Sequence, residues 1–151
     1  MFADRVVATY GTFDLFHEGH LNLLRRAREL AGGMGRGMLF VGVSTDEFNA
    51  TKGKKAVESF RQRKLAVERS GLASVVFAEK NWEQKPRDFR RFGVELLVMG
   101  SDHETNPKFT HLEDQTGVPV LFLPRTPEIS SSLLRSRLLD ARFESGLPTL
   151  A

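Results

Sequence analysis

Five short apolar runs, separated by stretches with helical spacing, constrain the fold of this chain more than any other feature. The runs are RVVATYG from Arg5, MLFVGVS from Met38, SVVFA from Ser74, VELLVMG from Val94 and VPVLFLP from Val118. Glycine or polar residues bound them, as is typical of buried strands. Strands that alternate with helices predict right-handed crossovers and a parallel sheet covered on both faces.

Segments with helical spacing fill the intervals between these runs. Helices are expected from Leu21 to before Gly32, from about Ser59 to Gly71, from Pro86 to Gly93, from Thr110 to Thr116, and from Ser130 through LLRSRLLDAR. A chain of 151 residues fits one domain. We therefore expect a single Rossmann-like α/β domain over residues 1–144, with about five parallel strands and helices on both faces. Residues 145–151 are expected to form a flexible C-terminal tail.

Charge and composition exclude several classes of partner. The formal net charge is only +3, and the lysines and arginines are scattered among acidic residues, which argues against nucleic-acid binding. The chain has no cysteine, so a disulfide framework or thiolate metal site is excluded. No apolar run approaches the roughly 20 residues that span a bilayer, and the N-terminus does not resemble a signal peptide. We expect a cytoplasmic protein with neither a nucleic-acid nor a membrane partner.

The segment GTFDLFHEGH, from Gly11 to His20, follows the first apolar run directly. His17 and His20 are therefore expected to flank the N-terminus of the next helix. Free backbone donors and the helix dipole favour an anion there, and imidazoles can add hydrogen bonds to phosphate oxygens. Two alternatives are a pair of ordinary surface histidines and a zinc pair. Zinc is disfavoured because the remaining histidines, His103 and His111, lie far along the chain, and we predict no metal-binding residues.

GTFDLFHEGH resembles the GTFDxxHxGH signature of the cytidylyltransferases. STDEFN at 44–49, EKNWEQK at 79–85 and LPRTPEIS at 123–130 resemble one branch, the glycerol-3-phosphate cytidylyltransferases, and the likeness covers roughly Val6 to Leu138. It implies a nucleotidyltransferase enzyme that transfers a cytidylyl group from CTP to sn-glycerol 3-phosphate. The products would be CDP-glycerol and pyrophosphate, usually for teichoic acid biosynthesis. The resemblance also implies a homodimer, and the cofactor Mg²⁺ is expected to be carried with the triphosphate.

The resemblance and the predicted phosphate-binding turns assign a set of residues to the nucleotide. These are Thr12, Phe13, His17, His20, Lys54, Asp102, Arg125, Thr126, Ile129, Ser130, Ser131 and Ser132. Four of them, His17, His20, Lys54 and Arg125, are expected to be catalytic, because direct attack on the α-phosphorus is accelerated by alignment and preorganised positive charge. The serines precede a second predicted helix and suit the β- and γ-phosphates, while one of them also serves as an ordinary N-cap.

Four residues are assigned to the acceptor, again through the resemblance. Lys52 and Lys85 would bind its phosphate, and Trp82 would wall its pocket. Trp82 could equally be core packing, and Arg63 could equally be a buried partner of other groups instead of a substrate contact. Lys55 is expected to be solvated.

Two departures from the family pattern bear on specificity. Pro127 and Glu128 replace the usual glutamate and glycine of an RTEGIST segment, and loss of the glycine restricts that loop. After the fourth run, His103 replaces a tryptophan and an ETNP insertion lengthens the loop expected beside the base. Two alternative functions therefore stay open: a cytidylyl- or adenylyltransferase for another phosphorylated alcohol, such as a sugar phosphate or ethanolamine phosphate, and a non-catalytic nucleotide-binding module.

Overall fold

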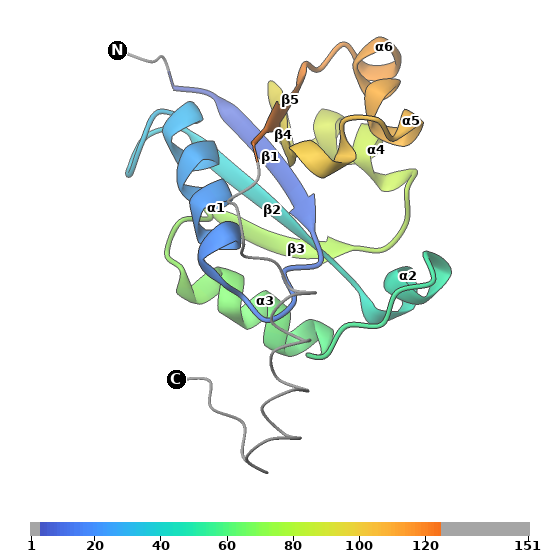
Figure 1. The fold of residues 1–151 in the computed structure, drawn as a ribbon. Helices are drawn as coiled ribbons and strands as arrows, with labels where there is room; N and C mark the ends of the chain where they lie inside the picture. The colour runs from blue at the N-terminus through green and yellow to red at the C-terminus, as the bar shows by residue number, and fades with distance from the viewer. Residues whose placement is uncertain (1–3, 125–151) are drawn as a thin grey trace.

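The computed structural model describes residues 4–124, which form one sheet with helices against both faces (Figure 1). In chain order the elements are β1 (Val6–Gly11), α1 (Glu18–Leu30), β2 (Met38–Ser44), α2 (Asp46–Thr51), α3 (Phe60–Arg69), β3 (Val75–Glu79), α4 (Gln84–Phe92), β4 (Leu96–Gly100), the short 3-10 helix η1 (Ser101–His103), α5 (Pro107–Thr110), α6 (Leu112–Thr116) and β5 (Val120–Leu123). Each of the five predicted strands is confirmed. The helix expected from Ser130, the domain limit at 144 and the expected tail lie outside the described residues.

The sheet is parallel throughout, with strand order β3-β2-β1-β4-β5. The chain runs from β1 outward through β2 to β3, and then returns to the other side of β1 as β4. The strand order therefore reverses between β1 and β4. In open sheets of this kind the ligand crevice lies beyond the carboxyl ends of the strands at that switch point.

Alternating side chains of the central strands build a core on each face of the sheet. Val7 on β1 packs with Leu24 of α1 and Val67 of α3 on one face, and all three are fully buried. Its neighbour Ala8 points to the other face, toward Phe89 of α4. Figure 1 shows α1 and α3 on the first face and α4, α5 and α6 on the second. The near-continuous apolar runs follow from this double coverage.

Helix limits differ from prediction in three places. α1 begins at Glu18, three residues before the predicted Leu21. α4 begins at Gln84, two residues before the predicted Pro86, because proline is tolerated throughout the first turn, where backbone N–H groups have no intrahelical acceptor. It ends as predicted at Gly93, which adopts the left-handed φ of 66°. The predicted helix from Thr110 to Thr116 is wrong in its limits: two short helices meet at His111, and α5 starts after Asn106, whose side chain caps it.

The sequence analysis missed helix α2, which follows β2 directly. Thr45 is its N-cap and accepts a hydrogen bond from the Phe48 amide, and Asp46 and Glu47 occupy its first turn. Threonine followed by acidic residues is a typical helix start, but six residues are too few for a clear hydrophobic period. The helix matters because it places Lys52 at its C-terminal end.

Candidate active site

A cavity of about 980 Å³ lies at the carboxyl ends of β1 and β4, at the predicted switch point. Nine predicted site residues line it: Thr12, Phe13, His17, His20, Lys52, Lys54, Trp82, Lys85 and Asp102. Arg63 is not among the lining residues. The predicted residues Arg125, Thr126, Ile129, Ser130, Ser131 and Ser132 lie outside the described part of the chain. Histidines from the N-terminus of α1, lysines from the end of α2 and the loop after it, and a lysine of α4 therefore meet across a single space.

The two histidines stand at the N-terminus of α1, as predicted. His17 is the N-cap and its Nδ1 accepts from the Gly19 amide at 3.0 Å, while Nδ1 of His20 accepts from the His17 amide at 3.3 Å. Their rings stack with centroids 3.8 Å apart. Because each Nδ1 accepts a hydrogen bond, the neutral tautomer carries its proton on Nε2. Both rings line the cavity, so the two imidazoles lie where they can contact a phosphate oxygen.

The turn that leads into α1 holds two non-glycine residues in the left-handed region, Phe13 at φ 55° and Leu15 at φ 49°. Such conformations cost of order 1 to 3 kcal/mol each and persist where the surroundings impose them. Phe13 is buried, and its ring meets that of His20 at 5.5 Å between centroids. Packing thus fixes the turn and, with it, the orientation of His20.

Asp14 links this turn to the loop that carries the lysines. Its carboxylate accepts hydrogen bonds from the amides of Val57 at 2.9 Å and Glu58 at 3.0 Å. In return the Leu15 amide donates to Oε1 of Glu58 at 2.9 Å. These three bonds hold the loop at 52–58 beside the histidines. The sequence analysis gave Asp14 no role, although the aspartate of the GTFD segment was a signal that it bears on the site.

Arg63 joins the turn after β1, the end of β2 and the loop before α3. Its side chain is fully buried, and the guanidinium donates to the carbonyl oxygens of Thr12 and Ser44 at 2.8 Å each and of Glu58 at 3.1 Å. A fourth bond, to Oδ1 of Asp46 at 2.8 Å, completes the set. Of the two alternatives left open by the sequence, the geometry favours buried pairing, because every guanidinium nitrogen is already engaged with the protein.

Lys52 reaches the cavity from the end of α2. Its ammonium lies 4.2 Å from the centre of the Phe48 ring. Burial, together with the nearby ammonium groups of Lys54 and Lys85, lowers the pKa of Lys52 to about 8, while Glu79 opposes the shift. The positive charge around Lys52 would stabilise an anionic ligand at this position.

Lys85 lies almost fully buried at the floor of the cavity, where it forms an ion pair with Glu79. Burial raises the pKa of Glu79, and the Lys85 ammonium opposes that shift. Close by, the Tyr10 hydroxyl donates to Oδ2 of Asp88 at 3.0 Å, and burial together with Asp88 raises the pKa of Tyr10. Tyr10 therefore stays a neutral donor, and this buried set fixes the position of Lys85.

Trp82 both lines the cavity and packs within an aromatic cluster. Its ring meets the edges of Phe48 and Phe109 with centroids 5.4 Å and 5.6 Å away. The two interpretations of this residue, pocket wall and packing, are therefore compatible. Because Phe48 belongs to α2 and Phe109 to α5, the tryptophan also connects α2 with the segment that the ETNP insertion lengthens.

The predicted base-binding loop follows β4 as the short helix η1. Asp102 is exposed there and lines the cavity. Its neighbour His103 lies against Phe109, with ring centroids 4.9 Å apart. Burial lowers the pKa of His103, Asp102 opposes the shift, and nearby lysines reinforce it. His103 is therefore neutral near pH 7 and presents a hydrogen-bonding ring instead of a charge.

The donors around the cavity suit phosphate oxygens. They are imidazole and ammonium groups, whereas two of the carboxylates that line it, Asp14 and Glu79, already bind backbone amides and Lys85. Within residues 4–124 no three His, Cys, Asp or Glu side chains gather as a metal site would require. In the same part of the chain, no helix combines the length and apolar character needed to cross a membrane.

A parallel sheet with an anion site at its switch point defines a class of nucleotide-binding α/β domains, and comparison narrows the class. A profile described as cytidylyltransferase-like matches residues 8–137. The chain belongs to this family. It is 45% identical over 132 residues to the glycerol-3-phosphate cytidylyltransferase of Bacillus subtilis, covering 87% of this chain and 95% of that one. The enzyme of the same name from Staphylococcus aureus is 42% identical, with coverage of 87% and 93%.

Solved structures support the fold independently. The lipopolysaccharide core biosynthesis protein from Thermoplasma volcanium superposes with a TM-score of 0.64 at 16% identity, covering 81% of this chain and 96% of that protein. At this level of identity the likeness concerns the fold alone, and it confirms the predicted Rossmann-like α/β class.

Proposed function

We propose that this protein transfers a cytidylyl group from CTP to sn-glycerol 3-phosphate, giving CDP-glycerol and pyrophosphate. The observation that carries the proposal is the near full-length similarity to two enzymes of that name. The cavity supports it, because paired histidines at a helix N-terminus face a group of lysines across one space of nucleotide size.

The reaction requires no covalent intermediate on the protein. A phosphate oxygen of glycerol 3-phosphate attacks the α-phosphorus of CTP, the new P–O bond forms, and the bond to the β-phosphate oxygen breaks to release pyrophosphate. Negative charge grows on the non-bridging oxygens at the α-phosphorus. We assign its stabilisation to Nε2–H of His17 and His20, with the α1 N-terminus and Lys54 beside them.

The acceptor is proposed to lie at the other end of the cavity, against Trp82. There Lys52 and Lys85 would hold its phosphate so that one oxygen points at the α-phosphorus. The Glu79 ion pair with Lys85 fixes one of these ammonium groups before substrate arrives, so little reorganisation accompanies binding.

Three further features of the proposal concern the nucleotide and the assembly. Mg²⁺ is proposed to enter as part of the CTP complex, where it would compensate part of the triphosphate charge. Asp102 is proposed to accept from the cytosine amino group, which a purine presents in a different place. The protein is further proposed to act as a cytoplasmic homodimer, and a sedimentation experiment tests the oligomeric state.

The deciding experiment is a substrate panel. CTP or ATP is combined with glycerol 3-phosphate or phosphoethanolamine in the presence of Mg²⁺, and both pyrophosphate and the nucleotide product are measured. CDP-glycerol should form with the highest kcat/KM of the four pairs. Equal kcat/KM for CTP and ATP would reject the cytosine pocket, and no turnover with any pair would favour a non-catalytic nucleotide-binding module.

A further inference from the structure

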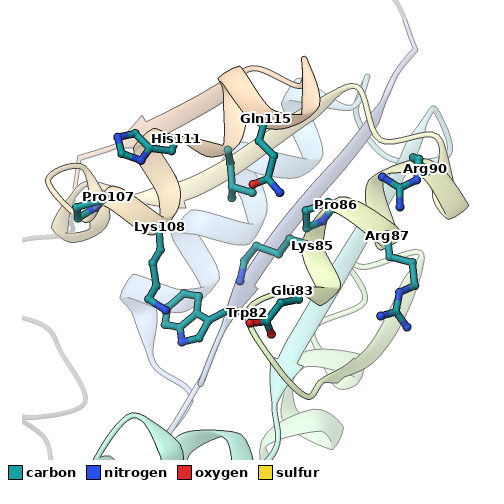
Figure 2. A pocket seen from close by; sticks show the side chains of 11 residues that line it. Trp82, Glu83, Lys85, Pro86, Arg87, Arg90, Pro107, Lys108, His111 and Gln115 are labelled. Atoms are coloured by element: carbon teal, nitrogen blue, oxygen red, sulfur yellow. The ribbon is translucent and has the colours of Figure 1, made fainter.

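Lys108 lies on the same tryptophan as the two proposed acceptor lysines, although no motif marks it. Its ammonium is 4.6 Å from the centre of the Trp82 ring, compared with 4.8 Å for Lys85 and 5.6 Å for Lys52. The side chain comes from α5, in the segment that the ETNP insertion lengthens. Figure 2 shows Lys85 and Lys108 converging on Trp82 from α4 and α5.

Lys108 also lies where two cavities adjoin. It lines the central cavity and a second one of about 580 Å³, and Trp82 and Lys85 are likewise shared by both. The second cavity adds Arg87 and Arg90, with Glu83 as its only acidic lining residue. The proposed acceptor end of the active site therefore adjoins the second cavity, whose lining also carries positive charge (Figure 2).

The charges around Trp82 do not cancel. Three ammonium groups surround its ring, whereas the carboxylates nearest to it in the two cavity linings are Glu79, which pairs with Lys85, and Glu83. The remaining positive charge favours an anionic acceptor, and the shared aromatic support keeps the ammonium groups close to one another. An acceptor with an ammonium head group would instead be repelled.

We propose that Lys108 is a third acceptor-binding lysine, whose charge favours glycerol 3-phosphate over phosphorylated alcohols that carry an ammonium group. This inference rests on the proposed function for the identity of the acceptor. Lys108 is exposed, whereas Lys85 is buried and paired. It is thus the lysine of the three best suited to close over the acceptor after it has bound.

The test compares Lys108→Ala and Lys108→Arg with Lys80→Ala. Lys80 is a matched control, because it is an exposed lysine two residues before Trp82 that lines neither cavity. Lys108→Ala should raise the KM for glycerol 3-phosphate about fivefold or more, and leave the KM for CTP within about twofold. Lys108→Arg should retain most of the affinity, and Lys80→Ala all of it.

Binding can be measured apart from turnover, because Trp82 is the single tryptophan of the chain. Its fluorescence is titrated with glycerol 3-phosphate, phosphoethanolamine and inorganic phosphate. In Lys108→Ala the affinity for glycerol 3-phosphate should fall more than that for phosphoethanolamine, so the preference between the two narrows.

The inference is overturned if Lys108→Ala keeps the wild-type KM and titration midpoints, or if Lys80→Ala changes them equally. If the variants still make CDP-glycerol, these outcomes contradict only the role of Lys108 and not the proposed function. If the wild-type protein makes none, the proposed function fails by itself. Lys108 is then judged by the inorganic phosphate titration, in which an unchanged midpoint would exclude it from the anion site.

Discussion

The affinity of this protein for its acceptor should fall as the pH rises through about 8, because Lys52 loses its proton there. Burial disfavours its ammonium form, and Lys54 and Lys85 repel it, so its pKa is lowered from 10.5 to about 8. A phosphate dianion is attracted to the protonated form alone. The lowered pKa of Lys52 therefore sets an alkaline limit on acceptor binding.

The size of the effect follows from the fraction of Lys52 that is protonated. If the acceptor binds only to that form, kcat/KM for glycerol 3-phosphate falls about twofold at pH 8 and about elevenfold at pH 9 relative to its plateau. The kcat should change far less, because bound phosphate stabilises the ammonium group and raises its pKa in the complex. The effect thus appears mainly in KM.

The assay measures kcat/KM for the acceptor at saturating CTP from about pH 7 to about pH 9.5. Lys52→Arg should remove the fall, since a guanidinium stays charged over this range. Lys55→Arg, an exposed neighbour on the same loop, should keep the wild-type profile. A flat wild-type profile between pH 7 and 9, or an unchanged fall in Lys52→Arg, would refute the reasoning.

Three other perturbations test separate parts of the site. His17→Ala and His20→Ala should each lower kcat by about two to three orders of magnitude without unfolding the protein. Steady-state kinetics measures kcat, and circular dichroism checks that each variant is folded. A histidine whose replacement leaves kcat unchanged has no part in the mechanism. Arg63→Met should lower the free energy of unfolding by about 3 kcal/mol, because the carbonyls of Thr12, Ser44 and Glu58 lose their donor. Urea denaturation measures this change, and unchanged stability with a raised acceptor KM would instead show a substrate contact. Excess chelator should abolish turnover by leaving the triphosphate charge uncompensated, and full activity without free divalent metal would eliminate Mg²⁺ from the proposal.

Local sequence patterns were sufficient to predict the five strands and the histidine turn of the active site. Five apolar runs bounded by glycine or polar residues predicted five strands, because a parallel strand covered on both faces must be apolar along its length. The histidine turn was predictable for a similar reason. A segment that follows a strand and opens a helix must lie at the carboxyl edge of the sheet, so His17 and His20 could be placed at the α1 N-terminus without coordinates.

The destination of each charged side chain was decided by tertiary structure. Arg63, Lys85 and Lys108 are all cations in helices, and the residues next to them in the sequence do not show which of them is buried. In the folded protein Arg63 is buried and bonded to three separate segments, Lys85 is buried against Glu79, and Lys108 stays exposed beside Trp82. Their partners are between 5 and 51 residues away in sequence. Burial and pairing depend on contacts between residues that are distant in the sequence. A local sequence pattern therefore cannot show whether a cation holds segments of the chain together, lies buried beneath the active site or faces the substrate.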